Sequence, residues 1–140
     1  MNPWEFQLTF ETPLTKLETF VKTIVSSAGP IQGASLTIDL VVFEPRTLID
    51  MLARYSIPPI CDRGLCLAAA GQLEVEELLV TVFSEWIDFL FVPEPASFAI
   101  YADHDEFTTF YAHSRLNLDR LVVALSEQGF KMEASYQRRF

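Results

Sequence analysis

Short runs in which apolar and polar residues alternate constrain the fold of this chain most strongly. In residues 4–10, WEFQLTF, every second residue is aromatic or aliphatic, and residues 34–43 and 130–136 repeat this pattern. Successive side chains of a strand point to opposite faces of its sheet, so these runs predict strands with one buried and one solvated face. Such strands are typical of antiparallel sheets, and we expect helices packed on the sheet.

Two segments between these runs have the apolar spacing of amphipathic helices. Residues 12–30 begin with Thr12, a residue suited to an N-cap, and Pro13, which is favoured at the first helical position. Residues 44–55 start in the same way at Pro45. Each segment therefore predicts a helix with one face turned to the core.

The middle and the end of the chain are harder to interpret. The apolar residues of 72–84 fit a helix or a strand, and their spacing favours the helix. Residues 57–71 show no clear pattern. A helix is expected to begin after Ser114 or Asn117 and to end at Gly129.

The chain length bounds the number of domains. A chain of 140 residues, half of them hydrophobic and twelve of them Phe, is the usual size of one domain with its own core. The sequence predicts a single α+β domain over residues 1–140. We expect a mainly antiparallel sheet of five or six strands with three or four helices packed on it.

An acidic tetrapeptide, residues 103–106 (DHDE), lies between two runs of aromatic and β-branched residues, 97–102 and 107–112. Aspartate favours turns because its side chain can bond nearby backbone N–H groups. The pattern therefore predicts a hairpin with a solvated acidic turn.

The net charge of −9 is unevenly distributed along the chain. No Lys or Arg occurs between Arg63 and Arg115, a stretch that contains nine carboxylates. A surface of this kind repels phosphate groups, so we expect neither nucleic-acid nor membrane binding. No apolar run is long enough to span a bilayer, and the first residues lack the pattern of a secretory signal. These observations predict a cytoplasmic protein.

The sequence contains no specific catalytic or cofactor motif. Cys61 and Cys66 lack the spacing of a zinc or redox pair, and the five glycines form no phosphate-binding loop. We expect no cofactor. One alternative is a small metal-dependent or small-molecule-processing enzyme that uses the Asp103–Glu106 loop with His113. Another is a subunit that forms a homodimer through an open strand edge.

The favoured hypothesis is a small acidic binding protein that neutralises a basic protein partner, as an immunity or antitoxin-type inhibitor of a nuclease-like bacterial toxin would. Carboxylates would steer the encounter, and exposed aromatic rings would anchor the complex. The residues expected to contact the partner are Asp103, Asp105, Glu106, Tyr101, Phe110 and Tyr111, with Glu74, Glu76 and Glu77 as a second acidic cluster. The hypothesis requires these carboxylates to share one side of the molecule with uncovered rings.

Overall fold

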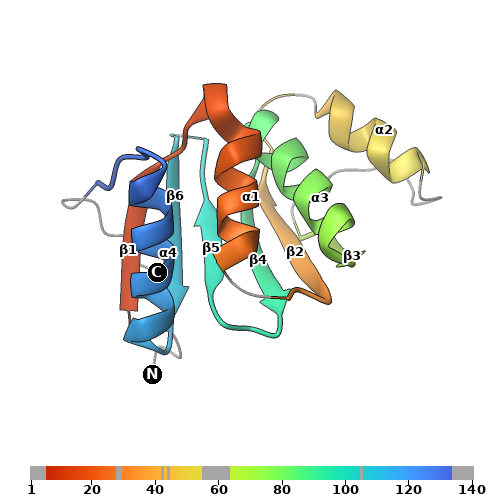
Figure 1. Cartoon of the computed structure of the whole chain (residues 1–140). Coiled ribbons are helices and arrows are strands. Elements are labelled where there is room, and N and C mark those ends of the chain that lie inside the picture. Colours follow the sequence, from red (N-terminus) through yellow and green to blue (C-terminus); the bar gives the residue numbers. More distant parts are fainter. Residues whose placement is uncertain are drawn as a thin grey trace.

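The protein folds into one six-stranded antiparallel sheet with four helices (Figure 1). The computed structural model describes residues 6–27, 30–41, 43, 45–54, 64–104 and 106–133. The strands are β1 (Phe6–Glu11), β2 (Gly33–Leu40), β3 (Cys66–Ala70), β4 (Asp88–Glu94), β5 (Ala99–Ala102) and β6 (Phe107–Ala112). The helices are α1 (Leu17–Ser27), α2 (Arg46–Arg54), α3 (Gln72–Ser84) and α4 (Arg115–Glu127), with a 3-10 turn, η1 (Leu14–Lys16), before α1. The predicted α+β class is confirmed.

The sheet has the strand order β1-β6-β5-β4-β2-β3, and all its pairs are antiparallel. Helix α1 packs between α3 and α4, and this helical layer lies on one face of the sheet (Figure 1). Helix α2 extends the layer beyond α3. Among the described residues, none of the helices has both the length and the apolar character needed to cross a bilayer.

The predicted alternation sorts the strand residues between the two faces. On β2, the residues Ala34, Leu36 and Ile38 are buried beneath the helices, whereas Ser35 is exposed on the opposite face. The core is rich in phenylalanine. The Phe20 ring of α1 makes edge-on contacts with the rings of Phe83, Phe110 and Phe130 at centroid distances of 5.7, 6.3 and 5.2 Å. Such contacts add about 0.5–1.5 kcal/mol each to the burial of the rings.

Helix starts differ from the sequence prediction. Thr12 does not cap α1, because its hydroxyl lies 2.7 Å from the hydroxyl of Thr108 in β6 and is used in that buried contact. The chain instead enters the helix through η1. Ser114 is the N-cap residue of α4 as expected, but its side chain makes no capping hydrogen bond. Gly129, at a φ of 85°, follows α4 as predicted.

The two segments that were hardest to interpret have different outcomes. Residues 72–84 form α3, so the helical alternative was correct. Residues 57–71 contain β3, the outer strand next to β2, and residues 55–63 lie outside the described part. At the end of the chain, Met132 forms an isolated antiparallel bridge with Phe10, and residues 134–136 of the predicted last strand lie outside the described part.

Candidate functional site

The predicted acidic turn joins β5 to β6. The Asp103 backbone N–H donates to the Phe107 carbonyl at 3.1 Å, and the Phe107 N–H reaches the Asp103 carboxylate at 3.3 Å. Glu106 is exposed and has a φ of 72°, a left-handed conformation suited to a tight turn. Asp105 lies outside the described residues. The turn therefore holds Asp103 and Glu106 at the surface, one half-buried and one exposed.

A buried carboxylate ties this turn to the start of β4. The Oδ1 atom of Asp88 accepts a hydrogen bond of 2.8 Å from the His104 backbone N–H, and the His104 Nδ1 atom lies 2.8 Å from the same oxygen. Asp88 is only 7% exposed. A buried carboxylate needs such partners, so we assign Asp88 a structural role in fixing the turn.

Two aromatic rings lie at the same end of the sheet, beyond the end of α3. Phe43 is 60% exposed, and its ring contacts the half-buried ring of Trp86 edge-on at a centroid distance of 6.4 Å. Trp86 has a φ of 60°, and a residue other than glycine in this region is held there at a cost of about 1–2 kcal/mol. Strain of this kind often accompanies functional positions.

The carboxylate of Glu85 lies beside these rings. It accepts a hydrogen bond of 2.6 Å from the Thr47 N–H in the first turn of α2. Phe43, Glu85, Trp86 and His104 line an open hollow of about 560 Å³. We define the hairpin-end patch as Phe43, Glu85, Trp86, Asp103, His104 and Glu106.

The strands carry charge of one sign only. None of the residues of β1 to β6 is Lys, Arg or His. Four strand residues are charged, and all are acidic: Glu11, Asp39, Asp88 and Glu94. The strand register places Glu11, Asp88 and Glu94 on the face away from the helices. The Tyr101 hydroxyl, on the same face, donates to the Asp39 carboxylate.

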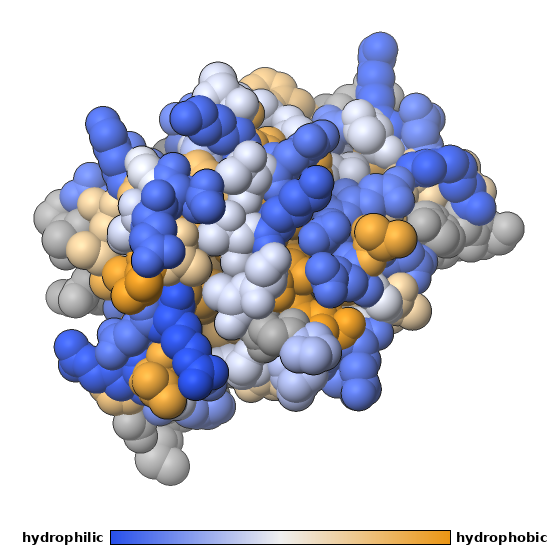
Figure 2. Space-filling model, viewed as in Figure 1, coloured by the Kyte–Doolittle hydropathy of each residue, from blue (hydrophilic) through white to orange (hydrophobic). Residues whose placement is uncertain are grey.

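The helical layer contains basic residues. Those in described helical segments are Lys16, Lys22, Arg46, Arg54, Arg115 and Arg120. Figure 2, viewed from the helix side, shows hydrophilic side chains over much of this surface with isolated hydrophobic residues between them. The described helices therefore carry charges of both signs, whereas the charged strand residues on the helix-free face are all acidic.

The three aromatic residues expected to contact a partner have different environments. Tyr101 is half-buried on the helix-free face of β5. Phe110 is 0% exposed, because it points into the helical layer and packs edge-on against Phe10 at 5.9 Å. Tyr111 is on the other face but is also buried. In this fold Phe110 and Tyr111 offer no surface to a partner, so their expected contact role is corrected to packing.

The second predicted acidic cluster belongs to the helical layer. Glu77 of α3 pairs with Arg54 at 2.5 Å, and Glu74 accepts a hydrogen bond of 2.9 Å from the Ala70 N–H. Glu76 lines a groove that also includes Lys22. Glu74 is eleven residues before Glu85, or about 16 Å along the helix. The structure therefore does not bring this cluster together with the acidic turn.

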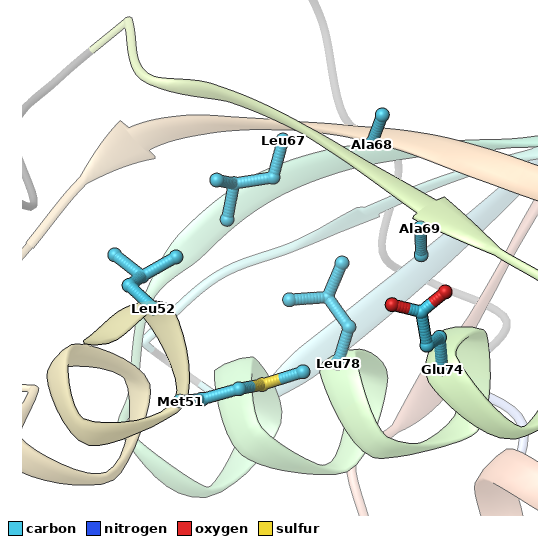
Figure 3. A pocket seen from close by; sticks show the side chains of 7 residues that line it. All are labelled: Met51, Leu52, Leu67, Ala68, Ala69, Glu74 and Leu78. Atoms are coloured by element: carbon cyan, nitrogen blue, oxygen red, sulfur yellow. The ribbon is translucent and has the colours of Figure 1, made fainter. Parts of the chain in front are cut away.

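A small crevice separates α2, α3 and β3 (Figure 3). Apolar side chains, among them Met51, Leu67 and Leu78, line most of it, and Glu74 is at one end. Its volume is about 80 Å³, whereas small-molecule sites occupy roughly 300–1,000 Å³. It is too small for a substrate site.

The structure separates the two parts of the site that the enzyme alternative would use. His113 follows the end of β6, about 20 Å along the strand from the Asp103–Glu106 turn, so the two cannot act on one substrate atom. Within the described ranges, no group of three or more His, Cys, Asp or Glu side chains is placed to hold a metal ion.

No protein-family model, curated protein or solved structure matches the chain. The function is therefore inferred from the residues and their geometry.

Proposed function

We propose that this protein binds a basic protein partner through the hairpin-end patch. The observation that carries the proposal is the exposed Phe43 ring, packed against a strained Trp86, at the acidic end of a sheet whose charged strand residues are all carboxylates. Exposed aromatic rings bordered by charged groups are typical of protein-binding surfaces.

The two kinds of residue would act at different stages of binding. Carboxylates around the patch attract a cationic surface over about 8–10 Å at physiological salt, which raises the association rate. The rings of Phe43 and Trp86 are then desolvated against the partner, and losing an anchor of this type costs about 2 kcal/mol or more of binding free energy. Charge would thus set the rate of encounter, and the rings would set the lifetime of the complex.

The finer proposal concerns the class of partner. Carboxylates presented on one surface can occupy a cleft built for phosphate groups, because both are anionic oxygen acceptors. A cationic nuclease-like toxin has such a cleft, and a cytoplasmic inhibitor of the immunity or antitoxin type fits a small acidic domain. The net charge of −9 supports this proposal, since it opposes direct binding to nucleic acid.

The experiment is a capture followed by an activity assay. The immobilised protein is exposed to extract from its own source, and parallel columns carry a Phe43→Ser variant or a Leu73→Ser control, in which an 82% exposed leucine of α3 is replaced. We expect a basic protein that is retained by the wild type and the control, lost on Phe43→Ser, and inhibited at a 1:1 ratio. Retention of the same protein by all three columns would refute the proposed binding site. A 1:1 complex that inhibits no activity of the partner would refute the inhibitor class.

A further inference from the structure

The face of the sheet opposite the helices has a regular row of side chains across four strands. Leu90 of β4 is opposite Thr37 of β2 and Tyr101 of β5, and Thr37 is in turn opposite Cys66 of β3. No described helix packs on this row. The described helices cover the equivalent positions on the other face of the sheet, so they leave this face uncovered.

Part of this face is accessible and apolar. Leu90 is 39% exposed although it belongs to an interior strand of the sheet, Leu40 is 43% exposed, and Val92 is half-buried. Beside them the side chains on β2 and β3 are small and exposed: Ser35, Cys66, Ala68 and Ala70. Toward β1 and β6 the side chains of Thr9, Thr109 and Tyr111 are buried. The accessible area therefore runs from β3 to β5.

Charge distinguishes between the possible occupants of this area. The exposed Glu94 lies at one end of β4 and the half-buried Asp39 of β2 lies near the other end, about 20 Å away along the strands, and the described strands contribute no cation. A second copy packed face to face would bring carboxylates against carboxylates, which is unfavourable. A basic partner is complementary to both ends and to the apolar area between them.

We propose that the accessible area of the helix-free face receives an amphipathic helix of a basic protein. Four strands span about 14 Å, which accommodates one helix of about 10–12 Å diameter, and the length of β4 matches about 13 helical residues. The apolar stripe of that helix would lie on Leu90 and Val92, with Lys or Arg near Glu94 and near the hairpin-end patch. This inference rests on the proposed function for the basic nature of the partner, and it adds a second contact area.

The test uses a defined peptide rather than the natural partner. The probe is a 14-residue amphipathic helix with leucines in one stripe and lysines on both flanks, and a scrambled peptide of the same composition is the reference. Titration of ¹⁵N-labelled protein should shift the amides of Thr37, Leu90 and Val92. Leu90→Lys should weaken binding at least about tenfold. Leu116→Lys, a matched change at a 60% exposed leucine of α4, should change it less than about twofold.

Each outcome bears on one proposal. Equal effects of Leu90→Lys and Leu116→Lys, with weakened binding by Trp86→Gly, would overturn this inference and leave the hairpin-end patch in place. Equal binding of the ordered and scrambled peptides to all variants would mean attraction by net charge alone and would overturn this inference. If light scattering shows a dimer that Leu90→Lys dissociates, a second copy occupies the face and the inference is wrong.

Discussion

The conformation of Trp86 allows a stability prediction whose sign depends on one backbone angle. Replacing Trp86 by Ala or by Gly removes the same ring, so the difference between these two variants reports on the backbone alone. At a φ of 60° the alanine retains a strain of about 1–2 kcal/mol that glycine does not have. Glycine loses about 0.5–1 kcal/mol more in backbone entropy. The Trp86→Gly variant should therefore be more stable than Trp86→Ala by about 0.75 kcal/mol, the difference between the mid-points of these two ranges.

Glu85 provides the control, because its φ of −97° is ordinary. Here the order should reverse, with Glu85→Gly less stable than Glu85→Ala by about 0.5–1 kcal/mol. Urea unfolding followed by circular dichroism measures all four variants, and the two differences should be opposite in sign. A Trp86→Gly variant no more stable than Trp86→Ala would refute the claim that the chain holds this ring in a strained position.

Three further predictions concern stability and can be measured by the same unfolding assay. Gly33→Ala should destabilise the protein by about 2 kcal/mol or more, because an added Cβ would lie 2.6 Å from the Ala69 carbonyl oxygen; a loss below 0.5 kcal/mol would contradict that packing. Thr9→Val or Thr109→Val alone should cost about 1–3 kcal/mol by leaving a buried hydroxyl unpaired, whereas the double variant should be less destabilised than the sum of the two. Asp88→Ala should cost about 2–3 kcal/mol, since two contacts from the turn lose their acceptor; a neutral effect would remove the structural role assigned to it.

Periodicity in the sequence was sufficient to predict the class of fold. Apolar residues alternate in β1 and β2 and have helical spacing in α1 and α2. This spacing indicates directly which face of each element is buried. Residues 66–70, CLAAA, were missed because short, small side chains on an outer strand produce little contrast between the two faces. Thr12 was misassigned as a cap because a tertiary contact with Thr108 uses its hydroxyl, and no local pattern reveals that contact.

The candidate site was only partly accessible to sequence reasoning. The acidic turn at Asp103 was predicted correctly from turn chemistry. Phe110 was misjudged because strand alternation does not say which face the helices cover. Phe43 and Trp86 were missed because their exposure depends on how the loops at the end of the sheet converge, and a positive φ at a tryptophan has no sequence signal.

The central claim is that a basic partner binds at the acidic turn Asp103–Glu106, and that the net charge of the protein alone does not account for binding. Association rate constants of the captured partner should be measured by stopped flow from low to high salt for two variants of equal charge. The variants are Asp103→Asn/Asp105→Asn/Glu106→Gln and the α3 control Glu74→Gln/Glu76→Gln/Glu77→Gln. We predict that the turn variant slows association about tenfold or more at low salt, that the control slows it less than about threefold, and that all rates converge near 1 M salt. Equal slowing by both variants, or by neither, would contradict the claim.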